Sequence, residues 1–326
     1  MNKKSKKILV DCHLDIAYSI RANRRNFEDI NPKFMISYDQ LRKSGADIFF
    51  STIFVSHRRA SAYREEAVEQ IKFYKKILKD YGSFYQILTN SDLKNIKKDK
   101  IGLYFLMEGA EPISDIDDLK YFTQMGIRTI GLTWNNENQY AFGVNQEGEL
   151  KRKGYDLINN MNDLGVSLDL SHLSEKSFNE AINETSLIPI ASHSNCYKVR
   201  RHNRNLKDYQ LKKISNLGGV TGIVLYNKFL TSKKKADLND ILKHFKHMLN
   251  VCGEDHIALG SDFDGAPIKD FPKGISEISD IQKIVNLLIK NKIRTSIIDK
   301  FLGQNILRVL NENLKKNKHL INSQNK

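Results

Sequence analysis

Short apolar segments alternate with amphipathic segments along nearly the whole chain of 326 residues. This alternation is typical of a parallel α/β architecture, in which each buried strand is followed by a helix that covers it. Eight such strand and helix units over about 270 residues predict a (β/α)8 barrel, the TIM barrel, with a doubly wound sheet as the alternative. The predicted strands are residues 7–13, 47–55, 101–108, 127–134, 166–172, 188–193, 219–226 and 256–262.

The segments between these strands show a helical period. Residues 62–82 are an example, because apolar side chains recur every three or four positions and Gly82 then supplies a helix stop. Ser37 and Ser91 are expected to cap two further helices, the first of them supported by Gln40 three residues later. Three more helical patterns close the chain, at residues 276–291, 294–302 and 303 to about 315.

No feature of the sequence marks a domain boundary. The chain has no proline-rich linker and no internal repeat, and no glycine-rich phosphate loop follows any predicted strand. The missing loop disfavours nucleotide binding. We therefore expect a single domain over residues 1–326, with frayed tails at residues 1–6 and about 316–326, where lysines gather.

Side chains that can hold a metal lie at the ends of the predicted strands. The strands of a barrel carry their carboxyl ends to one mouth, where active sites of this fold lie, so these side chains should converge there. Imidazole and carboxylate without thiolate favour zinc, with manganese or iron as alternatives, and one carboxylate can bridge two ions. Taken singly, each group could instead be a buried residue that is hydrogen-bonded to its neighbours. The candidates are His13 and Asp15 on the first strand, Glu108 on the third, His172 on the fifth, His193 on the sixth and Asp262 on the eighth.

The first of these strands ends in the stretch DCHLD, residues 11–15. Because side chains alternate along a strand, His13 and Asp15 should point to one face, and Cys12 should fill the opposite face as an apolar side chain. An imidazole beside a carboxylate suggests a metal ligand pair. The alternative is a histidine at the strand end that is hydrogen-bonded to a neighbouring aspartate.

Other histidines are less informative. His244 and His247 share one helical face without a third ligand nearby, and we expect both at the surface. His57 follows the second predicted strand and should therefore lie near the mouth.

Charge and cysteine content exclude several classes of protein. Lys and Arg outnumber Asp and Glu by 52 to 38, a net charge of +14, but the basic residues are scattered or gathered at the two ends, and no nucleic-acid module is visible. No apolar run is long enough to span a membrane or to form a signal peptide. Cys12, Cys196 and Cys252 are too widely spaced for a disulfide framework or a zinc finger. We expect a cytoplasmic protein without nucleic-acid or membrane partners.

Six motifs carry a family resemblance. They are DCHLD at 11–15, MEGAEPI at 107–113, DLSHLS at 169–174, SHSNCY at 192–197 followed by RNL at 204–206, GSDFDG at 260–265, and FLGQNILRVL at 301–310. With these motifs the chain resembles the membrane dipeptidase (renal dipeptidase) family, peptidase family M19 of the amidohydrolase superfamily, in which they occur in the same order.

The resemblance implies a site with two zinc ions at the mouth of the barrel. His13 and Asp15 would hold one ion, His172 and His193 would hold the other, and Glu108 would bridge them. A hydroxide bridging the two ions would attack the scissile carbonyl. Asp262 resembles the acid/base of the family, which takes the proton of the water and passes it to the leaving amine.

The resemblance also suggests residues that bind the substrate. Arg204 matches an arginine that clamps the C-terminal carboxylate of the substrate, a task suited to a permanently charged, bidentate guanidinium. The alternative is a solvated residue in the basic run RRHNRN. Trp134 stands where characterised mammalian members carry a histidine that contacts the reacting carbonyl. Either Asn135 or Asn136 takes over that polar contact, or the substrate differs.

The expected function is therefore that of a zinc-dependent dipeptidase acting on L,L and also L,D dipeptides with a free carboxylate. A second hypothesis keeps the two metals but changes the substrate to another small amide or a lactam. Trp134 in place of the family histidine supports this hypothesis. The non-enzymatic hypothesis is a metal-binding scaffold without activity. It predicts that a metal ligand or the acid/base residue is missing from the sequence, and none is missing. The resemblance also allows a homodimer.

Overall fold

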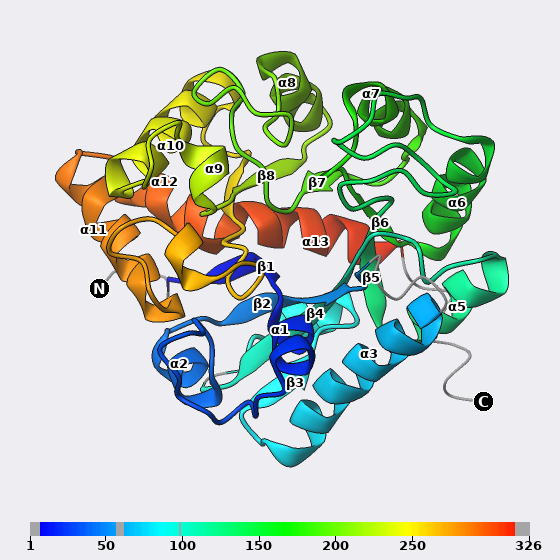
Figure 1. Ribbon diagram of the computed structural model, residues 1–326, viewed down its shortest axis with the longest axis horizontal. Helices are drawn as coiled ribbons and strands as arrows, with labels where there is room; N and C mark the ends of the chain where they lie inside the picture. Colours follow the sequence, from blue (N-terminus) through cyan, green and yellow to red (C-terminus); the bar gives the residue numbers. More distant parts are fainter. Residues whose placement is uncertain (1–6, 57–61, 98, 317–326) are drawn as a thin grey trace.

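The computed structural model describes residues 7–56, 62–97 and 99–316. Within these ranges, eight parallel strands stand side by side in the order β1-β2-β4-β5-β6-β7-β8-β9, and helices surround them (Figure 1). The predicted barrel is thereby confirmed. His57, residues 1–6 and all but the first residue of the predicted tail at about 316–326 lie outside the described residues. The strands are β1 Val10–Leu14, β2 Ile48–Phe54, β4 Ile101–Glu108, β5 Ile127–Gly131, β6 Ser167–Asp169, β7 Ile190–Ala191, β8 Val220–Ile223 and β9 Ile257–Leu259.

A short ninth strand, β3 (Phe84–Gln86), pairs in parallel with β4 outside this order, and the sequence did not predict it. The barrel closes where β1 meets the segment after β9, which we call the seam. Leu14 forms a parallel bridge with Phe263, the amide of Asp262 donates to the carbonyl of His13 at 3.1 Å, and the amide of Asp15 donates to the carbonyl of Phe263 at 3.1 Å.

The helices largely follow the predicted pattern. The Ser37 side chain accepts from the Gln40 amide and caps α2, as predicted, but the cap of α4 is Thr89, so the prediction of Ser91 is wrong. The described helices are α1 Ile16–Asn23, α2 Tyr38–Lys43, α3 Tyr63–Asp80, α4 Asn90–Lys94, α5 Ile116–Met125, α6 Arg152–Leu164, α7 Glu175–Glu184, α8 Asp208–Asn216, α9 Asn227–Leu230, α10 Leu238–Cys252, α11 Ile281–Lys290, α12 Thr295–Asp299 and α13 Asn305–Lys315, with a π-helical segment at Lys300–Gln304 and 3-10 turns at Ile268–Asp270 and Ile278–Asp280.

The lower interior of the barrel is filled by an apolar cluster. Alternate residues of β2 and β4 point inward, namely Ile48 and Phe50 from β2 and Tyr104 and Leu106 from β4, and helix α13 packs against the same cluster. Figure 1 shows α13 running across the barrel. The inward face that carries Leu106 continues upward to Glu108, so the apolar cluster lies directly beneath the mouth.

Strand β1 departs from strict alternation. Val10 pairs with Ile48 and faces the interior, yet His13, three positions later, faces the interior as well, because the register shifts between Asp11 and Leu14. Cys12 also belongs to the interior cluster, so the prediction that it packs on the opposite face from His13 is wrong. Such bulges commonly re-aim a side chain next to an active site.

The prediction for His244 is also wrong. This side chain is fully buried in α10, where its Nδ1 accepts from the Cys196 amide at 3.1 Å and its Nε2 lies 3.0 Å from the carbonyl of Leu230. Helix α10 therefore uses a histidine to satisfy backbone groups of two neighbouring segments. His247 is half-buried where α10 meets α8, with its Nε2 2.7 Å from the Asp208 carboxylate.

Candidate active site

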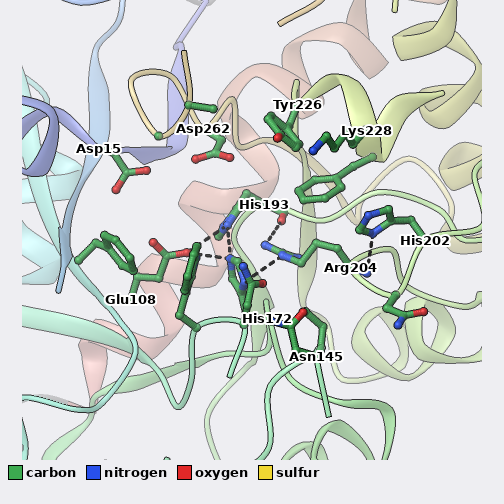
Figure 2. Close-up of a pocket in the computed structure, with 18 of the residues that line it drawn as sticks. Asp15, Glu108, Asn145, His172, His193, His202, Arg204, Tyr226, Lys228 and Asp262 are labelled. Carbon is green, nitrogen blue, oxygen red and sulfur yellow. Dashed lines mark hydrogen bonds and ion pairs between the residues drawn. The ribbon is translucent and has the colours of Figure 1, made fainter. Parts of the chain in front are cut away.

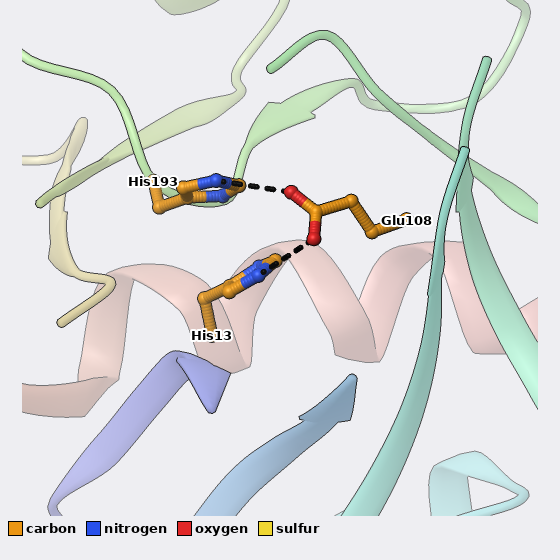
Figure 3. A group of neighbouring side chains, drawn as sticks. All are labelled: His13, Glu108 and His193. Atoms are coloured by element: carbon orange, nitrogen blue, oxygen red, sulfur yellow. Dashed lines mark ion pairs between the residues drawn. The ribbon is translucent and has the colours of Figure 1, made fainter. Parts of the chain in front are cut away.

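The six side chains proposed as ligands and acid/base come together at the carboxyl end of the barrel. Figure 2 shows five of them, and Figure 3 shows the sixth, His13, beside Glu108 and His193. The five proposed metal ligands are buried, and Asp262 is partly exposed to a cavity of about 780 Å³. Each stands at or just after a strand of the barrel, which is how segments far apart in the sequence meet at one point.

Glu108 lies between two sets of imidazoles. Its Oε1 is 2.8 Å from Nε2 of His172 and 3.3 Å from Nε2 of His193, whereas its Oε2 is 3.5 Å from Nε2 of His13. Figure 3 shows the carboxylate turned with one oxygen toward His193 and the other toward His13. A carboxylate that presents its two oxygens to two ligand sets is placed to bridge two ions.

A second group of potential ligands overlaps the first. His13, Asp15 and Asp262 bring one ligand atom each within 4.8 Å of one another, and Nε2 of His13 is 3.6 Å from Oδ2 of Asp15. The backbone at Gly265 packs against this group. A Cβ atom there would collide with Oδ1 of Asp262 and lie 2.5 Å from Oδ2 of Asp15, so only glycine leaves both carboxylates in place.

Some buried polar atoms of this cluster lack a hydrogen-bond partner and could be satisfied by a bound cation. Nε2 of His13 and Oδ1 of Asp15 are buried without a hydrogen-bond partner among the described residues, and each is a potential metal ligand. Burial alone would lower the pKa of His13, but the carboxylates of Glu108 and Asp15 outweigh it and raise this pKa well above the ordinary value. The donor set, imidazole and carboxylate around unsatisfied atoms, fits a divalent ion such as zinc.

The two other histidines are held neutral. Burial lowers the pKa of His172 to about 4, helped by the neighbouring Arg204, and burial together with the charge on His13 lowers that of His193. Their Nε2 atoms are only 2.9 Å apart. Neutral imidazoles with converging Nε2 atoms offer lone pairs to a metal at neutral pH.

A serine and an aspartate lie behind the ligands, and sequence reasoning missed both. The Ser192 hydroxyl donates to Oδ2 of Asp169 at 2.5 Å and lies 2.8 Å from Nδ1 of His193 and 3.3 Å from Nδ1 of His13. A hydroxyl that donates to a carboxylate can accept from both Nδ1–H groups, which leaves Nε2 of each imidazole as the ligand atom. The only signal in the sequence is that each polar residue shortly precedes a ligand.

Two groups compete for Nδ1 of His172. Oδ1 of Asn135 lies 2.8 Å from this atom, and Nε of Arg204 lies 3.1 Å from it. When Nδ1 carries the proton, it donates to Asn135, and Nε2 remains available to a metal. The structure thus brings Asn135, predicted as a substrate residue, against a proposed ligand at the edge of the cavity.

Arg204 is only 2% exposed, so the alternative of a solvated residue in a basic run is wrong. Its guanidinium donates to the Ser194 hydroxyl at 2.9 Å and to the carbonyl of His193 at 2.8 Å, in addition to the His172 contact. Burial lowers its pKa to about 10, so it stays charged at neutral pH. Nη1 and Nη2 each donate one hydrogen bond within the chain, which leaves one N–H on each for a ligand in the cavity. Nε–H faces Nδ1 of His172 and donates to it only in the tautomer that carries the proton on Nε2.

Three aromatic side chains form another part of the cavity lining. They are Tyr18, Phe54 and Trp134, and the rings of Phe54 and Trp134 lie 5.1 Å apart. Trp134 follows β5 at the mouth, with its ring 6.2 Å from that of His172. An indole therefore occupies the side of the site on which a histidine was expected from the resemblance.

The backbone is strained at two of the site residues. His172 has φ of 70° and Asp262 has φ of 65°, both in the left-handed region that favours glycine. Each conformation costs about 1–3 kcal/mol and turns the chain sharply at the end of a strand, so that the side chain faces the mouth. Strain of this kind at a cluster of ionisable groups is typical of functional sites.

Carboxylates and neutral imidazoles that converge on a solvent cavity at the mouth of an α/β barrel define a metal-dependent hydrolase. A model of the membrane dipeptidase family, peptidase family M19, matches residues 3–323. The chain belongs to this family.

One relative and two solved structures are similar to this chain. An uncharacterised dipeptidase of Schizosaccharomyces pombe is 27% identical over 333 residues, which cover 92% of this chain and 79% of the relative. A metallopeptidase from Rhodobacter sphaeroides, solved with a phosphinate mimic of the dipeptide L-Ala-D-Ala, has a TM-score of 0.88 and 24% identity and covers 94% of this chain and 100% of its own. Dipeptidase AC, a metallopeptidase of family M19, has a TM-score of 0.88 and 25% identity and covers 95% of this chain and 99% of its own.

The predictions of a TIM barrel, of family M19 and of a metal-dependent dipeptidase are thus confirmed. Among the described residues, no helix is both long enough and apolar enough to span a membrane.

Proposed function

We propose that this protein is a dipeptidase that holds two zinc ions at the mouth of its barrel. The observation that carries the proposal is the position of Glu108, whose two carboxylate oxygens face His172 and His193 on one side and His13 on the other. Asp15 would complete the His13 side. Manganese and iron remain the alternatives to zinc for these ligands.

Two divalent ions at these residues would lower the pKa of a bound water and polarise the scissile carbonyl. The residues of the chain supply proton transfer. Loss of hydration and the charge of the neighbouring Asp15 raise the pKa of Asp262 well above its ordinary value, which makes this carboxylate a stronger proton acceptor than an exposed one. Asp262 would accept the proton of the attacking water and deliver it to the leaving amine.

Arg204 would position the substrate. Its two unused N–H groups can bind a carboxylate in bidentate fashion, which fixes one end of a dipeptide beside the His172 and His193 side of the site. A substrate with a free C-terminal carboxylate in either the L,L or the L,D configuration satisfies this contact. The bound mimic of L-Ala-D-Ala in the Rhodobacter sphaeroides metallopeptidase supports the L,D choice.

The decisive experiment is hydrolysis of L,L, L,D and carboxyl-blocked dipeptides by zinc-reconstituted protein, together with the metal content per chain. We expect cleavage of the unblocked dipeptides, two ions per chain, and loss of cleavage in Glu108→Gln. Glu149→Gln, on an exposed glutamate, serves as the matched control. Absence of cleavage from folded protein with two ions bound would refute the dipeptidase proposal.

A different small amide or a lactam is the second candidate substrate, and the indole of Trp134 beside Phe54 favours it. An indole offers one donor and a large apolar face, unlike an imidazole. Trp134→His should raise the rate on simple dipeptides if the tryptophan restricts the choice of substrate. Unchanged kcat/KM values across the panel would remove this candidate.

We further propose that the protein works in the cytoplasm. The support is chemical, because Cys12, Cys196 and Cys252 are all free thiols in the structure. Fractionation of cells that produce the native chain, followed by detection with an antibody, tests this location.

A further inference from the structure

One side of the active-site cavity is basic. We call it the basic wall, and it consists of residues 201–204 together with Tyr226, Lys228 and Phe229. Figure 2 shows His202, Arg204, Tyr226 and Lys228 on this side, across from Asp15 and Glu108. Among the described residues, the carboxylates that line the cavity all belong to the proposed metal site and none to the basic wall; they are Asp15, Glu108 and Asp262.

The basic wall is held together by hydrogen bonds between its two segments. Nδ2 of Asn205 donates to the carbonyl of Arg200 at 2.9 Å and to that of Phe229 at 2.8 Å. Nε of Arg200 donates to the carbonyl of Lys228 at 3.2 Å. These bonds fix the segment that carries Arg204 against α9, so Lys228 is positioned beside the arginine by the fold.

Two cations of the basic wall form no ion pair with a carboxylate in the described part of the chain. They are Arg201 and Lys228, and both are exposed. The positive charges also affect His202. Burial lowers its pKa most, and the neighbouring cations Arg200, Arg204 and Lys228 lower it further. A cleft with one sign of charge concentrates ligands of the opposite charge.

We propose that the favoured substrates are dipeptides whose C-terminal residue has an acidic side chain, aspartyl or glutamyl. This inference rests on the proposed function, in which Arg204 binds the α-carboxylate. The Cα atom of the C-terminal residue is one bond from that carboxylate, so its side chain begins beside the basic wall, and the two configurations aim it at different parts of the wall. Arg204 balances the α-carboxylate, and Arg201 and Lys228 remain to receive a second anion.

The charges of the rest of the site agree with this choice. Divalent ions at the mouth would offset the three carboxylates there, so the cavity as a whole stays positive. A dipeptide with a neutral side chain leaves Arg201 and Lys228 in water, and one with a basic side chain brings like charges together. Two partly exposed ion pairs are together worth about tenfold in kcat/KM.

The test compares isosteric substrates on the zinc-reconstituted full chain. The kcat/KM values of Ala-Asp and Ala-Asn, and of Ala-Glu and Ala-Gln, are measured in both configurations of the C-terminal residue, with Ala-Ala as reference. We expect an acid-to-amide ratio of about ten, falling to about two in the double variant Arg201→Gln, Lys228→Gln. Lys234→Gln removes an exposed charge that does not line the cavity, and the ratio should persist in it.

The possible results distinguish failure of this inference from failure of the proposed dipeptidase function. Efficient cleavage of Ala-Ala with a ratio near one would overturn the inference and leave the dipeptidase standing. A ratio of ten that survives in the double variant would overturn the assignment to Arg201 and Lys228. Absence of cleavage of any dipeptide would overturn both. A ratio that declines toward one at about 1 M salt would support the electrostatic origin.

Discussion

The two ends of the barrel interior are built in opposite ways. The lower interior is an apolar cluster sealed by α13, with side chains such as Phe50, Leu106 and Leu310 fully buried. The mouth above it holds buried ionisable groups and two left-handed residues, His172 and Asp262. Apolar burial stabilises the fold by about 1.5–3 kcal/mol for each large side chain, whereas unpaired polar atoms and backbone strain oppose it.

This contrast teaches that one set of strands serves two purposes along its length. Strand β4 passes from Tyr104 and Leu106 in the apolar cluster to Glu108 at the mouth, within five residues. Substitutions at the mouth should therefore alter chemistry and metal binding with little loss of stability. Substitutions in the lower interior should do the reverse.

The largest effect is expected from Asp262→Asn, which removes the proposed proton carrier but keeps its shape. We expect kcat to fall by about 10²–10⁴ while metal content and thermal stability stay near those of the wild type. Asp163→Asn, on the exposed side of α6, is the matched control. Retention of more than half the activity would show that another group moves the proton.

The next effect belongs to the lower interior. Leu310→Ala should lower the free energy of unfolding by about 2–5 kcal/mol, because it leaves a cavity in the cluster beneath the mouth. Urea denaturation measures this loss, and kcat per folded molecule should not change. Leu217→Ala, at a leucine that is 47% exposed, should change stability by no more than about 0.5 kcal/mol. A fall in kcat for Leu310→Ala would break the separation between the two ends.

Ser192→Ala sharpens the comparison, since this residue lies just below the ligands. Loss of the hydroxyl shared by His13 and His193 should weaken metal binding about 10–100-fold, measured by competition with a chelator. Both ions should be affected, because the two imidazoles lie on different sides of Glu108. Equal affinities in Ser192→Ala and in the surface control Ser215→Ala would contradict this role.

The smallest effect concerns Glu111, behind the mouth. Burial raises its pKa from 4.5 to about 7, so the folded state binds a proton that the unfolded state has already lost between these values. The stability of the wild type should therefore fall as the pH rises from about 4.5 to 7, by at most about 3 kcal/mol and by less to the extent that water reaches this half-buried side chain. Glu111→Gln should lack this fall in urea titrations at pH 5 and pH 8. Parallel pH profiles for the variant and the wild type would refute it.

Much of the fold and of the site could be predicted because the sequence shows both the period of strands and the period of helices. Alternating strands and helices predicted the barrel, and the positions of His13, Glu108, His172 and His193 after apolar runs predicted that they would meet at the mouth. The chemistry of the ligand types then pointed to a metal. These inferences depend on patterns local to each strand, which a sequence contains directly.

The parts that the sequence did not predict depend on contacts between distant segments. The register shift in β1 arises from pairing with β2, and it turned His13 to the interior face that Val10 and Cys12 share. His244 is buried because Cys196 and Leu230 supply backbone partners. Ser192 acquires its role only where Asp169 and two histidines surround its hydroxyl.

The seam between β1 and the segment after β9 has a consequence for the time course of folding. Ser261 donates its amide to Asp11 at 2.9 Å across 250 positions of the chain. Closing so long a loop is slow, and during synthesis the first ligands must wait until almost the whole barrel has left the ribosome. We therefore expect the metal to bind only after synthesis of the chain is complete. Closure of the barrel at the seam would be the step that makes a newly made molecule able to bind it.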